Sequence, residues 1–182
     1  GGQVADIGIF KSTNLNGEIL NCKKVGDFHL HEVTIAEGSL ELNADVELII
    51  DSERREKIVS NHSATHLLHS ALRKVLGESV EQRGSLVNEE KLRFDFSHSN
   101  KVTDDQIMEI EDIVNLKIEE AIDTKTEVLP YEDALKTGAL AFFGDKYGEK
   151  VRVVYINGDF SVEFCGGTHA VSYTHLTLPT SV

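Results

Sequence analysis

His62-Ser63-Ala64-Thr65-His66 places two histidines four residues apart in a segment with helical periodicity, so both lie on one helix face. Near the other end of the chain, Cys165-Gly166-Gly167-Thr168-His169 places a thiol and an imidazole at the same spacing. Three imidazoles and one thiolate form a mixed nitrogen and sulfur set that suits tetrahedral Zn²⁺. About 100 residues separate the pairs, so the tertiary fold must gather them. The sequence predicts one zinc ion per chain, bound by His62, His66, Cys165 and His169.

Each pair alone has a simpler interpretation. A helix that carries Leu67, Leu68 and Leu72 can bury one of its histidines in a core without any metal. The two pairs together favour the metal. A metalloprotease helix carries a glutamate between its two histidines as general base, and this chain has none there. We therefore assign no side-chain base, and a catalytic role would fall to a zinc-bound water or to carbonyl polarisation by the metal.

Length and composition indicate a soluble chain of one domain or two small ones. Among 182 residues there is no apolar run near the ~20 residues that a membrane span needs. The first residue is Gly rather than Met, which favours a piece of a longer protein. The two cysteines, Cys22 and Cys165, do not suggest a disulfide framework, so we predict the reducing cytoplasm as the location.

The formal net charge of −13 argues against nonspecific binding to nucleic acid, which needs clustered cations. It leaves open a nucleic-acid substrate that other domains help to hold. Several basic residues are close together in sequence, and for most of them a solvated mixed-charge surface is the simpler interpretation. They are Arg54, Arg55, Lys57, Arg73, Lys74, Arg83, Lys91 and Arg93.

The predicted fold class is α+β, with a small β-barrel over residues 1–55. Short β-branched segments over Val4–Phe10, Phe28–Ile35 and Val46–Ile50 predict strands, and Asn16-Gly17 predicts a hairpin turn. Residues 56–171 form the second predicted domain, an α+β sandwich. Residues 172–182 carry no charge and form an atypical tail.

Helices and strands are expected to mix in the second domain. Ser60 or Asn61 can cap a helix that ends at Gly77, and Thr103-Asp104-Asp105-Gln106 is a capping box for a helix to about Ile122. The other predicted elements are a strand at Leu92–Phe96, a strand at Glu127–Leu129, a helix at Tyr131–Lys136 and a hairpin of Val151–Ile156 with Phe160–Phe164 around Asn157-Gly158. Cys165 then lies at a strand end, where a ligand is held rigidly.

These motifs together resemble the editing domain of alanyl-tRNA synthetase and its free-standing relatives. The resemblance covers Gly1 to Ala170 and extends beyond the ligand pairs. The threonyl-tRNA synthetase editing domain shares the two ligand pairs, but the Gly-Gly-Gln opening favours alanine. The matching segments are Gly1–Asp6, Asn61–His69, Gln82–Val87, Leu92–His98, Ala141–Gly148 and Cys165–His169.

The resemblance implies a function. The parent enzyme of this family ligates alanine to tRNA(Ala) with ATP, and we expect its aminoacylation domain to lie outside this chain. The part present resembles the hydrolytic domain that removes wrongly attached serine or glycine. The implied partners are the acceptor end of mischarged tRNA(Ala) and the other domains of the parent synthetase, with no membrane partner. The chain departs from the family pattern after Ala170.

The resemblance also implies roles for four further residues. Because serine is only a hydroxyl larger than alanine, an activation pocket rejects it weakly and a second, hydrolytic site is needed. Thr65 and Gln82 are the candidates to bind the serine hydroxyl, and the backbone NH groups of Gly166 and Gly167 to face an oxyanion or the terminal adenosine. The alternatives are a threonine bonded to its own helix, a solvated glutamine and a tight glycine turn.

Other functions remain open from the sequence. The chain can be a structural zinc module that binds RNA without catalysis, or a free-standing hydrolase that edits in trans. It can also be a hydrolase of small esters or amides, or a fragment without activity. Activity on mischarged tRNA separates these classes.

Overall fold

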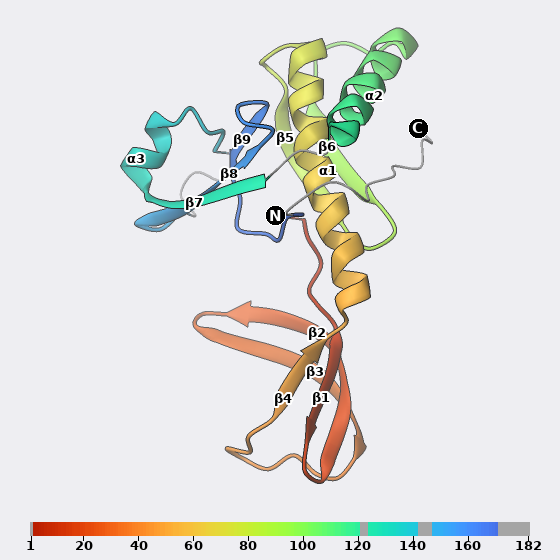
Figure 1. The fold of residues 1–182 in the computed structure, drawn as a ribbon, viewed down its shortest axis with the longest axis vertical. Helices are drawn as coiled ribbons and strands as arrows, with labels where there is room; N and C mark the ends of the chain where they lie inside the picture. Colours follow the sequence, from red (N-terminus) through yellow and green to blue (C-terminus); the bar gives the residue numbers. More distant parts are fainter. Residues whose placement is uncertain (1, 121–123, 142–146, 171–182) are drawn as a thin grey trace. The chain divides into compact units, whose positions relative to one another are not determined.

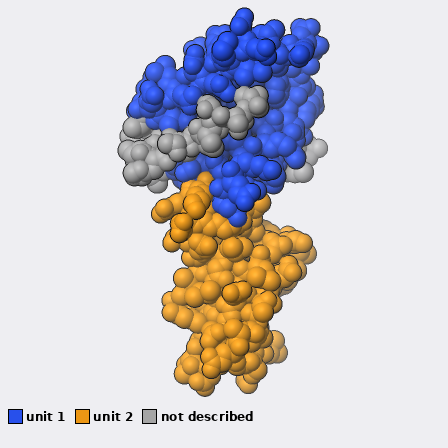
Figure 2. Space-filling model, turned by 90° about the vertical axis from the view of Figure 1, so that its right-hand side faces the viewer, with its two compact units in different colours: residues 1–3, 58–182 blue, residues 4–57 orange. Residues whose placement is uncertain are grey.

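The computed structural model describes residues 2–120, 124–141 and 147–170 (Figure 1). The predicted helix end near Ile122, residues 142–146 of the Ala141–Gly148 segment and the tail at 172–182 lie outside these ranges. The chain divides into two compact units, residues 4–57 and residues 1–3 with 58–182 (Figure 2). The α+β class is confirmed, since antiparallel sheets and separate helices share the chain. No described helix has the length and hydropathy that a membrane crossing requires.

Residues 4–57 form a four-stranded antiparallel sheet. Its strands are β1 (Gly8–Ser12), β2 (Leu15–Val25), β3 (Phe28–Glu37) and β4 (Glu47–Ile50), in the order β3-β2-β1-β4. The expected barrel is not closed, because the edge strands β3 and β4 do not pair within the described chain. The small core of this unit consists of Phe10, Leu15 and Ile19.

The predicted hairpin turn at Asn16-Gly17 is wrong. The turn falls at Thr13-Asn14, and Gly17 lies inside β2 opposite Phe10. A Cβ on Gly17 would lie 2.6 Å from the Phe10 ring and 2.3 Å from the Thr34 carbonyl oxygen. This glycine therefore makes room for an aromatic ring across the strand pair, a tertiary requirement that resembles a turn signal in the sequence.

Helix α1 (Ser52–Leu76) carries the first ligand pair and begins earlier than predicted. Asp51 caps it, with its carboxylate accepting a hydrogen bond from the Arg54 backbone at 2.9 Å. The first turns are charged and show no apolar stripe, so the sequence pattern placed the start at Ser60 or Asn61. The helix end is as predicted: Gly77 has φ +104°, and its N–H donates to the Arg73 carbonyl at 3.0 Å.

Helix α2 (Asp104–Glu119) packs beside α1 (Figure 1). The capping box at Thr103 is confirmed by reciprocal hydrogen bonds with Gln106. Ile110, Val114 and Ile118 of α2 are buried and join the main core of the unit of residues 1–3 and 58–182. That core consists of Leu67, Ala71, Leu72, Val80, Ile110, Val114, Ile118, Val154 and Ile156. The packing holds α1 in a fixed rotation, which fixes the direction of its histidine face.

The unit of residues 1–3 and 58–182 also contains two antiparallel sheets. One pairs β5 (Glu81–Val87) with β6 (Leu92–Ser97), and the other has the order β7-β8-β9. The strands of the second sheet are β7 (Thr124–Pro130), β8 (Lys150–Ile156) and β9 (Ser161–Phe164), and α3 (Tyr131–Lys136) follows β7. The predicted Asn157-Gly158 turn is confirmed, with φ of 53° and 60°. Cys165 directly follows β9, as predicted, and its N–H donates to the Arg152 carbonyl at 3.0 Å.

Candidate metal centre

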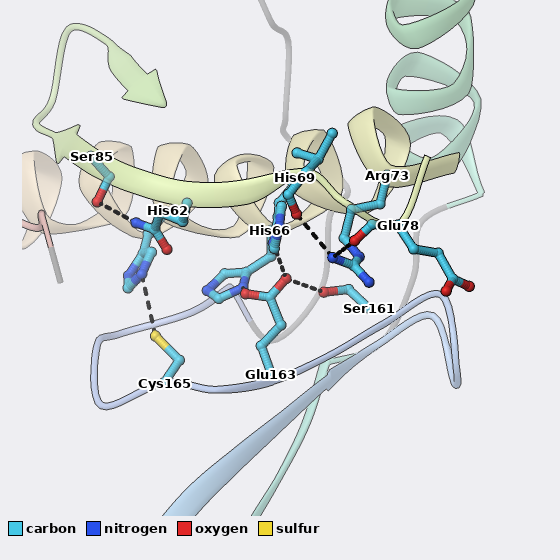
Figure 3. A network of polar contacts seen from close by, with 11 residues as sticks. His62, His66, His69, Arg73, Glu78, Ser85, Ser161, Glu163 and Cys165 are labelled. Carbon is cyan, nitrogen blue, oxygen red and sulfur yellow. Dashed lines mark hydrogen bonds and ion pairs between the residues drawn. The ribbon is translucent and has the colours of Figure 1, made fainter. Parts of the chain in front are cut away.

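The fold brings the two ligand pairs together. His62 and His66 lie one turn apart on α1, and their residues are only 6% and 7% exposed. Cys165, directly after strand β9, lies next to these two histidines. His169 follows four residues later, after the Gly166-Gly167 pair. Figure 3 shows the Cys165 sulfur facing the His62 ring. The ligand atoms of His62, His66, Cys165 and His169 all lie within 4.8 Å of one another.

The donor geometry suits a metal ion of the size of zinc. His62 Nε2 lies 3.4 Å from Cys165 Sγ. The ring centroids of the three histidines are 4.4–5.3 Å apart. A tetrahedral shell with bonds of about 2.0–2.3 Å separates its donors by about 3.3–3.8 Å, so small side-chain rotations complete it. His66 Nε2 and both ring nitrogens of His169 are buried and meet no hydrogen-bond partner in the described chain, as expected of atoms that face a ligand position.

The two helix histidines are oriented by hydrogen bonds at their Nδ1 atoms. His62 Nδ1 lies 2.8 Å from Gln3 Oε1, which also accepts from the Thr168 backbone N–H at 3.1 Å. His66 Nδ1 lies 2.8 Å from Glu163 Oε2. A carbonyl or carboxylate oxygen only accepts, so each Nδ1 carries a proton and each Nε2 faces the other ligands. Nε2 is then the atom available to a metal.

The electrostatics of the centre favour a metal-binding form of its thiol. Burial alone would raise the pKa of the Cys165 thiol, but the surrounding imidazoles of His169, His62 and His66 lower it to about 3. Burial lowers the pKa of His169 to about 4. Thiolate and neutral imidazole are the forms that ligate a metal.

His66 differs from the other members of the centre. Burial opposes its charged form, yet the charges of Glu163 and Cys165 raise its pKa to about 10. This shift favours the protonated ring, whereas a metal ligand must be neutral, so a metal ion that binds at Nε2 competes with a proton there.

Comparison with known proteins shows which proteins this chain is similar to. Residues 151–174, which include Cys165 and His169, match the model of the threonyl and alanyl tRNA synthetase second additional domain. The chain is 48% identical over 170 residues to the alanine–tRNA ligase of Pseudomonas fluorescens, covering 93% of this chain and 20% of the ligase. It is 48% identical over 179 residues to that of Halalkalibacterium halodurans, covering 98% of this chain and 20% of the ligase.

The chain is homologous to part of the alanine–tRNA ligases. It spans about one fifth of the length of the curated relatives that it matches. The resemblance to alanyl-tRNA synthetase that the ligand pairs and the Gly-Gly-Gln opening predicted is thus confirmed.

Thr65 and Gln82, the residues predicted to bind substrate, line a pocket of about 40 Å³. Three of the candidate ligands, His62, His66 and Cys165, line the same pocket. Ser85, Phe94 and Glu163 also line it. The hydroxyl of Thr65 donates to the Asn61 carbonyl at 2.8 Å, the backbone bond that the sequence left open as an alternative. Gln82 lies within β5 and donates to Ser85 Oγ at 3.0 Å. Both side chains therefore reach the pocket wall; their roles toward a substrate remain predictions.

The two glycines of the Cys165 segment are not equivalent. A Cβ on Gly167 would lie 2.1 Å from His62 Cε1 and 2.8 Å from Gln3 Oε1. A Cβ on Gly166 would meet nothing within 4 Å. The Gly167 carbonyl accepts a hydrogen bond from the Arg152 guanidinium. Only Gly167 is needed for close packing, and whether either N–H faces an oxyanion remains a prediction.

Sequence reasoning missed three residues that support the centre: Gln3, His69 and Glu163. Gln3 is held beside β5, where the Gly2 carbonyl accepts from the Val87 N–H at 2.8 Å. His69 follows His62 by seven residues, so both share a helix face. Glu163, in β9, precedes Cys165 by two residues, the spacing that places side chains of an extended segment on one face. Helical and strand periodicity could have found the last two, but nothing in the sequence relates Gln3 to His62.

Proposed function

We propose that this chain is the editing part of an alanine–tRNA ligase and that it hydrolyses the ester bond of tRNA(Ala) charged with serine or glycine. The observation that carries this proposal is the convergence of His62, His66, Cys165 and His169 at a small pocket that Thr65 and Gln82 also line. The homology to alanine–tRNA ligases supplies the substrate class. By the same homology the partners are the tRNA acceptor end and the remaining domains of the ligase, in the cytoplasm.

The pocket has room for a small side chain, and two of its lining residues offer hydrogen-bonding groups for a hydroxyl. A volume of about 40 Å³ holds roughly two or three water molecules, which is close to the space of a serine side chain. The Thr65 oxygen donates its one proton to Asn61, so its lone pairs remain to accept from a substrate hydroxyl. The Gln82 amide carries both donor and acceptor atoms. Alanine would leave such groups unpaired, and this difference favours hydrolysis of the serine ester.

The donor set of the four candidate ligands supports zinc as the metal of this centre. Three imidazole nitrogens and one thiolate sulfur favour zinc over magnesium or calcium, which prefer oxygen ligands. Bound zinc supplies a Lewis acid that polarises a carbonyl or activates water. Gln3 and Glu163 orient His62 and His66 for it, and Gly167 keeps the Cys165 segment close to His62.

Hydrolysis of mischarged tRNA tests the proposal directly. The zinc-loaded chain is mixed with tRNA(Ala) carrying labelled serine, and the loss of ester is followed over time. We expect faster loss of serine than of alanine, the matched control, and loss of this activity on chelation with recovery on added zinc. A folded, zinc-loaded chain that leaves both esters at their spontaneous rate would contradict the proposal.

Thr65→Val is expected to reduce the preference for serine over alanine by about 5- to 100-fold. Valine keeps the shape of threonine and removes the hydroxyl, and a lost hydrogen bond to a buried polar group costs about 1–3 kcal/mol. The measurement is the ratio of the two hydrolysis rates. Thr126→Val, at an exposed threonine of β7, is the control. An unchanged ratio in Thr65→Val would remove Thr65 from substrate recognition.

A second candidate function is a structural zinc module that binds tRNA without chemistry. The observation in its favour is that all four protein donors can converge, which is typical of closed structural sites. Binding of the tRNA acceptor end by zinc-loaded chain, combined with no ester hydrolysis, would identify this function instead.

A further inference from the structure

We infer that Glu163 is a shared positioning residue that orients both His66 and His69 through their Nδ1 atoms. The inference deepens the proposed function and rests on its metal centre. Glu163 Oε2 lies 2.8 Å from His66 Nδ1, and Oε1 lies 2.9 Å from His69 Nδ1. Ser161 Oγ adds a third contact, 3.3 Å from Oε1. Figure 3 shows the carboxylate reaching the histidine face of α1 from the strand below it.

Because the Glu163 carboxylate is buried, its ionised form is stable only with hydrogen-bond partners. Glu163 is 4% exposed and His69 is 1% exposed. An ionised carboxylate removed from water costs several kcal/mol unless charged or hydrogen-bonded partners compensate it. Each carboxylate oxygen is bonded to a histidine, and both histidines come from α1. The strand that carries Cys165 is thereby tied to the helix that carries His66.

The geometry determines which nitrogen of His66 can bind a metal. A carboxylate oxygen accepts and cannot donate, so a hydrogen bond with Nδ1 requires the proton on Nδ1. The Nε2 atom of His66 then points to the other ligands, where it is buried. In metal sites, such an outer carboxylate fixes the ring orientation of the ligand and raises its basicity.

The same carboxylate connects the metal centre with the pocket wall. His69 and Glu163 both line the pocket. The His69 ring also contacts Phe94 of β6, with ring centroids 5.0 Å apart. Held between Glu163 and Phe94, His69 keeps the second oxygen of the carboxylate in place. Removal of His69 is therefore expected to disturb His66 although the two rings are bound to different oxygens.

Zinc affinity tests the inference without reference to catalysis. The chain is titrated with zinc against a chromophoric chelator, and Co²⁺ absorption reports the ligand shell. We expect Glu163→Met, which keeps the side-chain length and removes both acceptors, to weaken zinc binding about 10- to 100-fold. Glu163→Gln, with one acceptor oxygen, should fall between Glu163→Met and the wild type. The control is Glu127→Gln, a carboxylate on β7 of the same sheet, which should bind zinc like the wild type.

A pair of His69 variants provides an independent test if Glu163→Met does not fold. His69→Asn can place an amide N–H near the position of Nδ1–H and should retain most of the zinc affinity. His69→Leu removes the donor and should weaken zinc binding by about threefold or more, a smaller loss than at Glu163 itself. Equal affinities in these two variants would show that the contact between His69 and Glu163 has no positioning role.

The two proposals fail in different ways. Zinc binding within twofold of the wild type in a folded Glu163→Met variant, with an unchanged Co²⁺ spectrum, overturns the inference about Glu163. A zinc-loaded wild type that does not hydrolyse mischarged tRNA overturns the proposed function only. A wild type that binds no zinc overturns both.

Discussion

Cys165→Ala is expected to weaken zinc binding by about 100- to 1,000-fold and to abolish hydrolysis of serine-charged tRNA(Ala). Structural zinc sites contribute about 10–16 kcal/mol, or about 2.5–4 kcal/mol for each of four ligands if they share it equally. Cys165 supplies the only sulfur within the cluster, and its thiolate is surrounded by His62, His66 and His169. Loss of the thiolate also removes the negative charge that the three imidazoles surround.

The chain offers a matched control for this substitution. The chain has one other cysteine, Cys22, which lies in β2 of the other unit and is also half-buried. Cys22→Ala should bind zinc and hydrolyse the ester like the wild type. Zinc stoichiometry is measured after dialysis, and affinity by chelator competition. Full zinc occupancy together with retained hydrolysis in Cys165→Ala would contradict both the ligand assignment and the role of the centre.

Gly167→Ala is expected to disrupt the same centre by steric means. The added Cβ would lie 2.1 Å from His62 Cε1 and 2.6 Å from His62 Nδ1, far inside contact distance. Either the His62 ring or the Cys165 segment must move. Overpacking of this kind costs about 1–3 kcal/mol, which corresponds to a loss of about 5- to 150-fold in zinc affinity if the strain falls on the bound state. Displacement of His62 would also break its hydrogen bond with Gln3.

Gly166→Ala is the matched control, one residue away in the same turn. Its Cβ would meet nothing within 4 Å, and neither glycine needs a positive φ in this structure. We expect zinc affinity and urea stability close to those of the wild type. The comparison is made by chelator competition and by urea unfolding with and without zinc. Equal behaviour of the two glycine variants would show that the turn relaxes without moving His62.

Short-range features of the fold could be predicted from the sequence because they depend on neighbours in the chain. The capping box at Thr103, the Asn157-Gly158 turn and the helix end at Gly77 each follow from the chemistry of a few consecutive residues. The errors have the same origin. Asn16-Gly17 has the composition of a turn, but the ring of Phe10 needs the space at Gly17, and Phe10 lies on another strand.

The sequence alone was enough to predict the donor types, their spacing within each pair and the resemblance to alanine–tRNA ligases. Four-residue spacing on a helix and at a strand end depends only on local geometry, so His62 with His66 and Cys165 with His169 could be named in advance. The tertiary structure alone decided that the pairs meet, that Gln3 and Glu163 orient the two helix histidines, and that Glu163 also holds His69. The three contacts join residues 59, 97 and 94 positions apart, and packing of the core between α1, α2 and β8 fixes them. Hydrogen bonds over such separations leave no periodic pattern in the sequence, because nothing local requires them.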